Sequence, residues 1–238
     1  MTPTLIVTRP EAQGLGFARA LESRWDGPLD TVLSPLIAIS FQPIVNDLSD
    51  VTDLVFTSAH GVTAAASVGL GPGLSAWCVG PKTAELARSA GFETITGPGD
   101  AAALANLIIA QSQKGEFAHL RGRHSRGDLS SELGVAGIPC RDVIAYDQIA
   151  QPLAVEAQKV LNETRPVLCP LFSPRTATIL GKQGPFSAPL DIVAMSQAVA
   201  DAAYEVAPRS VTIAAHPDED AMIAATLVQL HRISHDDD

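Results

Sequence analysis

The sequence predicts an α/β protein made of two similar units. Strand-like and helix-like segments alternate along the chain, and several strand-like runs are apolar throughout, which is typical of parallel sheets covered on both faces. The second half also repeats motifs of the first. With 238 residues, 46% of them hydrophobic, the chain can form buried cores in one large domain or in two of roughly 100 residues each.

Nine segments read as strands, and helical patterns with recognisable ends lie between them. Pro81 suits the first position of a helix that ends before Gly91, and Asp100 suits the cap of the next helix. Strands that alternate with helices indicate an α/β fold. The predicted strands cover residues 4–7, 31–41, 53–58, 76–80, 117–121, 140–146, 166–172, 191–196 and 210–214.

The two halves resemble each other motif by motif, and the offset between paired residues grows only slowly, as insertions in loops would make it grow. We therefore interpret the chain as a duplicated α/β unit. The alternative is that any two α/β units look alike at this level. The pairs are Ser58 with Ser173, Gly80 with Ser196, and Asp100 with Glu219.

Charge and composition exclude several classes of protein. The formal net charge of −10 argues against a nucleic-acid binder, whose surface would carry a basic patch. The amino terminus does not read as a signal peptide, and no apolar run approaches the ~18 residues of a membrane span. We therefore expect a cytoplasmic protein with no membrane partner. The three cysteines, Cys78, Cys140 and Cys169, are far apart in apolar runs and are expected to be buried thiols.

The usual cofactor motifs are missing. Gly14 and Gly16 form a lone G-x-G without a third glycine, and the pair Gly181-Lys182 lacks the earlier glycine of a phosphate-binding loop. The histidines show no metal-binding spacing beyond His231 and His235, which stand in a tail expected to be frayed and solvated. We expect no metal and no cofactor.

Short turns at the ends of predicted strands have a physical use. A strand that ends in Thr57-Ser58 and leads into a helix leaves unpaired backbone N–H groups at the helix start, where the helix dipole favours an anion. At the turn after strand 76–80, Gly80 lets a ligand approach the backbone closely. Ser173 and Ser196 stand at similar turns in the second half. Such turns can hold carboxylates without positive charge. The alternative for each hydroxyl is an ordinary helix cap.

Several of these motifs together resemble the uroporphyrinogen-III synthase family. The similarity runs from Thr4 to about Leu230 in the family's order. It rests on T-R-P at 8–10, F-T-S-A-H-G-V at 56–62, V-G-P-K-T-A at 79–84, L-R-G at 120–122, V-I-A-Y at 143–146 and F-S-P at 172–174.

The resemblance implies a cofactor-free enzyme that cyclises the linear tetrapyrrole hydroxymethylbilane to uroporphyrinogen III and inverts ring D. It also implies two flavodoxin-like α/β domains linked by a two-stranded antiparallel crossing. The first domain would comprise residues 1–36 and 150–238 and the second residues 42–142, with crossing strands at 37–41 and 143–149. We expect a monomer.

The resemblance also implies the roles of individual residues. Tyr146 would assist departure of the hydroxyl group, since a phenol can donate a proton at neutral pH; its alternative role is structural. Where the family often has Gly and Thr, this chain has Ser196 and Val199. Together with the turns and the cations near them, the resemblance gives the expected substrate-binding residues: Arg9, Thr57, Ser58, His60, Gly80, Lys82, Thr83, Arg121, Ser173, Arg175 and Ser196. For Lys82 and Arg175 the alternative is a solvated surface charge.

A function of a different class fits the same features. A two-domain module with anion-holding turns could bind or sense a small polycarboxylate without catalysing a reaction. In that case Tyr146 and the turns would only bind the ligand.

Overall fold

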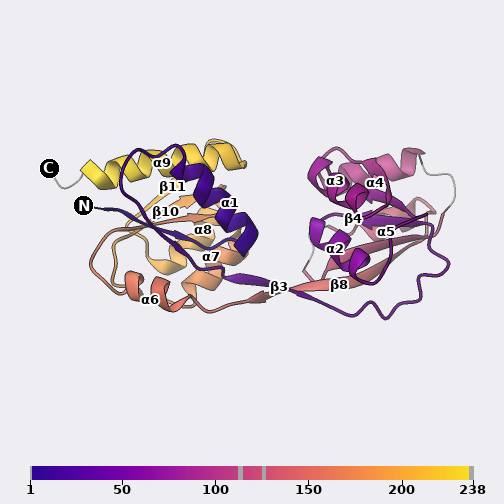
Figure 1. Ribbon diagram of the computed structural model, residues 1–238, viewed down its shortest axis with the longest axis horizontal. Coiled ribbons are helices and arrows are strands. Elements are labelled where there is room, and N and C mark those ends of the chain that lie inside the picture. Colours follow the sequence, from indigo (N-terminus) through magenta and orange to yellow (C-terminus); the bar gives the residue numbers. More distant parts are fainter. Residues whose placement is uncertain (1, 112–114, 125–126, 236–238) are drawn as a thin grey trace. The chain divides into compact units, whose positions relative to one another are not determined.

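The computed structural model describes residues 2–111, 115–124 and 127–235 (Figure 1). The chain forms two compact units, one from residues 1–38 with 149–238 and one from residues 39–148. We call them unit 1 and unit 2 and describe each by itself. Each unit is a sheet with helices on both faces, so the predicted α/β class with two parallel-sheet units is confirmed.

Unit 1 contains a parallel sheet with five strands among the described residues. In sheet order these are β11 (Ser210–Ile213), β10 (Leu190–Ala194), β9 (Val167–Leu171), β1 (Thr4–Val7) and β2 (Asp30–Leu33). All neighbouring strands are parallel. Numbered along the chain within the unit, the strand order is 2-1-3-4-5, the order of flavodoxin-like sheets.

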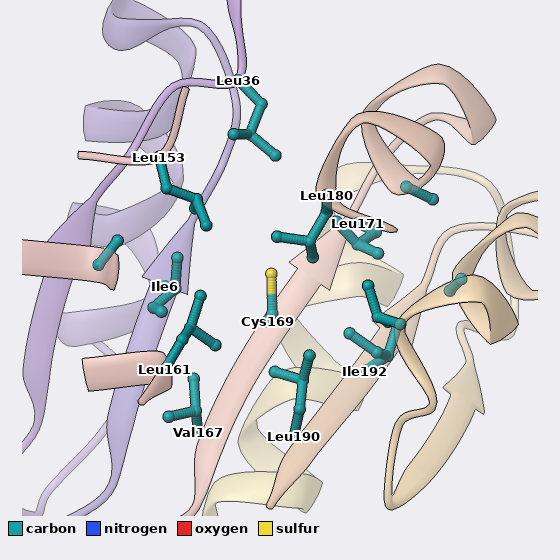
Figure 2. Close-up of a cluster of buried hydrophobic side chains, with 14 of the residues drawn as sticks. Ile6, Leu36, Leu153, Leu161, Val167, Cys169, Leu171, Leu180, Leu190 and Ile192 are labelled. Carbon is teal, nitrogen blue, oxygen red and sulfur yellow. The ribbon is translucent and has the colours of Figure 1, made fainter. Parts of the chain in front are cut away.

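Helices cover both faces of the unit 1 sheet. On one face, α1 (Glu11–Glu22) and α9 (Glu219–His235) pack in one core cluster. On the other lie α6 (Val155–Leu161), α7 (Pro174–Gly181) and α8 (Gln197–Ala203), and a short 3-10 helix, η1 (Tyr204–Val206), follows α8. Figure 2 shows Cys169 of β9 among Leu161, Leu180 and Leu190 in this second cluster, and all four are nearly inaccessible to solvent.

Unit 2 contains six strands among the described residues. In sheet order they are β3 (Ile37–Phe41), β8 (Cys140–Ala150), β7 (Phe117–Gly122), β4 (Asp53–Phe56), β5 (Ser75–Cys78) and β6 (Glu93–Thr96). The helices α2 (Ala59–Ser67) and α3 (Pro81–Ser89) cover one face, and α4 (Ala101–Gln111) and α5 (Leu129–Val135) cover the other.

The two sheets share one strand order. The run β8-β7-β4-β5-β6 of unit 2 corresponds to β2-β1-β9-β10-β11 of unit 1, strand for strand. Ser58 and Ser173 consequently follow equivalent strands, as do Gly80 and Ser196. The predicted pairing of motifs thus corresponds to equivalent positions in space within each unit.

The strands β3 and β8 are neighbours in the sheet and run in opposite directions. The amide of Gln42 donates to the carbonyl of Ala145, whereas the amide of Gln151 donates to the carbonyl of Leu36, so one strand advances as the other returns. The chain passes between the units at residues 38–39 and 148–149, within these two strands.

Three expectations about individual segments were wrong. The predicted strand 31–41 is divided into β2 and β3, because Pro35 lacks an amide hydrogen and the Ser34 hydroxyl instead accepts from the amide of Ala154. The strand β6 was not predicted, since E-T-I-T has no continuous apolar run. The tail from His231 to His235 is helical rather than frayed, because Ile233 is buried and His231 contacts the Trp25 ring; residues 236–238 lie outside the described range.

Candidate active site

The carboxyl edge of the unit 2 sheet gathers most of the predicted site residues. The strands β4, β5, β7 and β8 are parallel neighbours, so their carboxyl ends lie at one edge, which is where ligands bind in such sheets. Within a few residues of those ends stand Thr57, Ser58, His60, Gly80, Lys82, Thr83, Arg121 and Tyr146.

Ser58 caps helix α2. Its backbone is extended, and its hydroxyl oxygen accepts a hydrogen bond of 3.3 Å from the amide of His60. This is the ordinary cap role that the sequence left open, and it uses one of the amide groups expected to hold an anion. The hydroxyl hydrogen of Ser58 is not used by this bond and can still be donated to a ligand.

The start of α3 provides a second turn at the same edge. Gly80 precedes Pro81 with φ −167°, an extended conformation that any residue can adopt. A Cβ atom added at Gly80 would contact only Cα of Gly99, at an ordinary 3.7 Å. Neither backbone conformation nor packing therefore requires glycine here, and its backbone can be approached closely. Lys82 is exposed, whereas Thr83 is buried.

Tyr146 lies at this edge with its ring buried. The residue is only 6% exposed, and His60 contacts its ring edge-on with centroids 5.4 Å apart. A methyl group at Gly122 would lie 2.8 Å from Cε2 of Tyr146, so glycine at that position makes room for the ring. Among the described residues the phenol oxygen has no hydrogen-bond partner, yet it does not belong to the fully enclosed polar atoms.

His60 is held neutral by its surroundings. Burial lowers the pKa of the imidazole, because a charged ring would lose hydration. At neutral pH His60 is therefore a hydrogen-bonding group in edge-on contact with the Tyr146 ring rather than a cation for a carboxylate.

A polar network lies on the face of the unit 2 sheet that α4 and α5 cover. The Thr57 hydroxyl lies 3.0 Å from Nε2 of His119, whose Nδ1 lies 3.4 Å from Oδ1 of Asp142. The other carboxylate oxygen of Asp142 accepts from Arg121 at 2.7 Å, and Ser130 donates to Oδ1 at 2.5 Å. Two predicted site residues, Thr57 and Arg121, are thus connected through two residues that sequence reasoning did not select.

The carboxylate of Asp142 is ionised in this network. The neighbouring His119, then Arg121 and Ser130, hold the pKa of Asp142 well below its usual range, against the opposing effect of burial. The contact between His119 and Asp142 does not meet hydrogen-bond geometry. The lowered pKa of Asp142 therefore rests mainly on the shorter hydrogen bonds from Arg121 and Ser130.

The carboxyl edge of unit 1 holds the remaining predicted residues. Ser173 caps α7 by accepting from the amide of Thr176 at 3.1 Å, and its hydroxyl lies 2.8 Å from that of Thr176. Ser196 precedes α8 but makes no capping hydrogen bond with its side chain. Arg175 is partly exposed in the first turn of α7.

Arg9 follows β1, and its side chain contacts other residues of unit 1. Its guanidinium pairs with Glu219 and lies over the Phe172 ring, 4.2 Å from the centroid. Arg9 and Arg121 are the arginines at equivalent strand ends, and each forms an ion pair with a carboxylate of the protein. These two expected substrate cations are therefore not isolated charges.

The described part of the chain holds neither a metal-binding cluster nor a membrane-spanning helix. Over residues 2–111, 115–124 and 127–235, no group of three or more His, Cys, Asp or Glu side chains could hold a metal ion. In the same ranges, none of the helices combines the length and the apolar character that crossing a membrane requires. The three cysteines are free, and burial raises the pKa of Cys78 to about 11 and of Cys169 to about 12, so both remain thiols.

Three functional candidates were missed by sequence reasoning. His119 interrupts the apolar run F-A-H-L, which was the available signal, whereas Asp142 stands beside Arg141 in C-R-D-V and gave no comparable signal. They become neighbours only through the register that pairs His119 with Asp142 across β7 and β8. Gly122 was quoted in the L-R-G motif, but its contact with Tyr146 depends on the shift in register beside it.

Comparisons with known proteins agree with this architecture. The chain superposes on the uroporphyrinogen-III synthetase of Helicobacter pylori 26695 with a TM-score of 0.69 at 16% identity, covering 96% of this chain and 100% of that one. A mutant uroporphyrinogen III synthase of the extremely thermophilic bacterium Thermus thermophilus gives 0.54 at 15% identity, covering 99% and 100%. These likenesses establish the fold. No curated protein matches the sequence significantly.

A family-level match extends beyond the fold. The family model described as uroporphyrinogen-III synthase HemD matches residues 19–224, which is most of the chain. The matched range includes the carboxyl-edge turns of unit 2, the network around Asp142, and Tyr146. The chain therefore belongs to the uroporphyrinogen-III synthase family.

Proposed function

We propose that this chain cyclises hydroxymethylbilane to uroporphyrinogen III by orienting the substrate with neutral donors and assisting hydroxyl departure with Tyr146. Family membership gives the reaction, a cyclisation in tetrapyrrole biosynthesis. The observation that supports the residue assignment is the Tyr146 hydroxyl, which has no partner among the described residues although its ring is buried. The phenol oxygen is not fully enclosed, so a ligand at this edge can accept its hydrogen without displacing a partner from the described part of the protein.

The cyclisation needs little acid–base catalysis from the protein. Donation of a proton from Tyr146 to the hydroxymethyl oxygen would release water, and the pyrrole nitrogen stabilises the cation left behind. Attack by the ring D carbon that carries the inter-ring methylene gives a spiro intermediate, which fragments and recloses with ring D inverted. The proton lost from carbon on final closure can return to the phenolate, so the net change is loss of one water.

Orientation is the harder task, because spontaneous closure at the free ring carbon gives the other isomer. Holding the reacting carbons in place is worth a large part of a reaction barrier. In this proposal the carboxylates are held by the amides and hydroxyls at Ser58, Gly80, Thr83, Ser173 and Ser196. Lys82 and Arg175 would add charge at the same helix starts, and His60 would contact the substrate beside Tyr146.

The proposal is tested by giving freshly prepared hydroxymethylbilane to the purified protein and resolving the product isomers after oxidation. We expect isomer III to predominate. Isomer I alone, the spontaneous product, would show that the chain does not catalyse the reaction and would favour the binding module.

We also propose that the enzyme acts in the cytoplasm as a monomer and without a nucleic-acid partner. The formal net charge of −10 supports the last point, since a nucleic acid would be repelled. Sedimentation velocity at micromolar concentration checks the oligomeric state, and a dimer would contradict this part of the proposal.

A further inference from the structure

The Thr57 hydroxyl lies between a buried histidine and the carboxyl edge of unit 2. Thr57 is partly exposed, directly after β4, whereas His119 is 4% exposed in the middle of β7. The distance of 3.0 Å between the Thr57 oxygen and Nε2 of His119 means that one of these atoms donates to the other. Which one donates decides what Thr57 can offer to a ligand.

The position of Asp142 decides the tautomer of His119. Nδ1 of His119 is completely buried, and Oδ1 of the Asp142 carboxylate lies 3.4 Å from it. The carboxylate also binds Arg121 and Ser130, so it is an acceptor-only group. A lone pair on Nδ1 would face this negative charge, whereas an N–H is attracted to it. Of the two neutral tautomers, this geometry favours the one with the hydrogen on Nδ1, in which Nε2 is the acceptor.

We propose that His119 is a positioning residue that turns the Thr57 hydroxyl hydrogen inward, so that Thr57 accepts a hydrogen bond from a pyrrole N–H of the substrate. With its hydrogen committed to Nε2, the Thr57 oxygen offers only lone pairs. The substrate carboxylates are acceptors and cannot bind it, whereas each pyrrole ring carries an N–H. This inference rests on the proposed function, and it assigns Thr57 a partner other than the carboxylates expected from the sequence.

The tautomer can be observed directly on the wild-type enzyme. Long-range ¹H–¹⁵N correlation spectra of ¹⁵N-histidine-labelled protein distinguish a protonated ring nitrogen from an unprotonated one, and loss of the signal in His119→Gln assigns it. We expect a protonated Nδ1 and an unprotonated Nε2 for His119 at neutral pH. Protonation of Nε2, alone or together with Nδ1, would overturn the proposal. The spectrum does not depend on activity, so it separates this inference from the proposed function.

A double-mutant cycle tests whether His119 acts through Thr57. Thr57→Val removes the acceptor and keeps the side-chain shape, and loss of one hydrogen bond is expected to lower kcat/KM about 2- to 13-fold. His119→Gln should lower kcat/KM in the wild-type background and change it little in the Thr57→Val background. Equal losses in both backgrounds would make His119 purely structural. Thr63→Val, at an exposed threonine of α2, is the matched control and should leave activity unchanged.

Product binding shows whether the pyrrole N–H or the hydroxymethyl O–H of the substrate donates to Thr57. Uroporphyrinogen III keeps its pyrrole N–H groups but has lost the hydroxymethyl group. Thr57→Val should therefore weaken anaerobic product binding by a similar factor. Unchanged product affinity together with reduced turnover would overturn the pyrrole assignment, because it would place the hydroxymethyl group at Thr57. Unchanged turnover and unchanged product affinity would remove Thr57 from the site.

Discussion

Gly122→Ala should displace the Tyr146 ring and slow turnover. An added methyl group would lie 2.8 Å from Cε2, 3.0 Å from Cζ and 3.3 Å from the phenol oxygen. Ordinary van der Waals contact begins at 3.4 Å, so the ring must retreat by about 0.6 Å. Gly122 does not have positive φ, so alanine adds no backbone strain and the effect comes from this contact alone.

The magnitude follows from the packing around the ring. Because Tyr146 is 6% exposed among buried neighbours, the displacement should destabilise the fold by about 1–3 kcal/mol, as overpacking does. Misplacing a catalytic group by about 1 Å can cost about 100-fold in rate, so a shift of about 0.6 Å should lower kcat about 10- to 100-fold. The assays are urea unfolding and initial rates of isomer III formation under conditions where both proteins are folded.

Gly134→Ala is the matched control. Gly134 lies in α5 of the same unit, and its added methyl group would meet nothing within 4 Å. The control should keep wild-type turnover and equal or exceed wild-type stability, since alanine is favoured over glycine in helices by up to about 1 kcal/mol. In a Tyr146→Phe background, Gly122→Ala should add little further loss of turnover. Wild-type turnover by Gly122→Ala itself would refute the idea that the ring position matters.

Three other predictions address the remaining parts of the site. Tyr146→Phe should lower turnover roughly 100-fold or more with product binding nearly intact, since it removes the proton donor but keeps the ring; near-wild-type turnover would return Tyr146 to a structural role. Ser58→Ala and Ser173→Ala should each cost about 1 kcal/mol of folding stability as lost caps and about 0.5–1.5 kcal/mol of transition-state stabilisation; unchanged stability by urea unfolding would contradict the cap geometry. Asp142→Asn should lower the free energy of unfolding relative to wild type above about pH 5, and this difference should shrink below about pH 4, as measured by urea unfolding at each pH.

The sign of the Asp142 effect follows from the direction of its pKa shift. The folded-state pKa lies below the unfolded value of 3.8, so the unfolded chain binds the proton first as pH falls. The stabilisation is therefore present above the unfolded value and is lost as pH falls through the folded one. A difference between wild type and Asp142→Asn that stayed constant from pH 6 to pH 3 would contradict this linkage.

Local signals made much of the fold predictable from the sequence. Pro81 begins α3, Gly91 follows it with φ +90°, and the Asp100 side chain accepts from the amide of Ala103 in the first turn of α4, as the residue types indicated. The network around His119 was not predictable in the same way. Thr57 and Asp142 meet His119 from distant parts of the chain, and only the alignment of β4, β7 and β8 brings them to the same face.

The electrostatics of the site favour neutral recognition of a highly anionic substrate. With a net charge of −10, the protein as a whole repels eight carboxylates, and Arg9 and Arg121 are already paired with Glu219 and Asp142. Ion pairs of this kind give the arginines fixed positions but reduce the charge that they offer to a ligand. Short-range donors remain: backbone amides at helix starts, whose dipoles attract anions, and hydroxyl hydrogens such as that of Ser58. In the proposed mechanism, these directional donors would select the arrangement of the carboxylates as well as their charge, and that arrangement would decide which isomer forms.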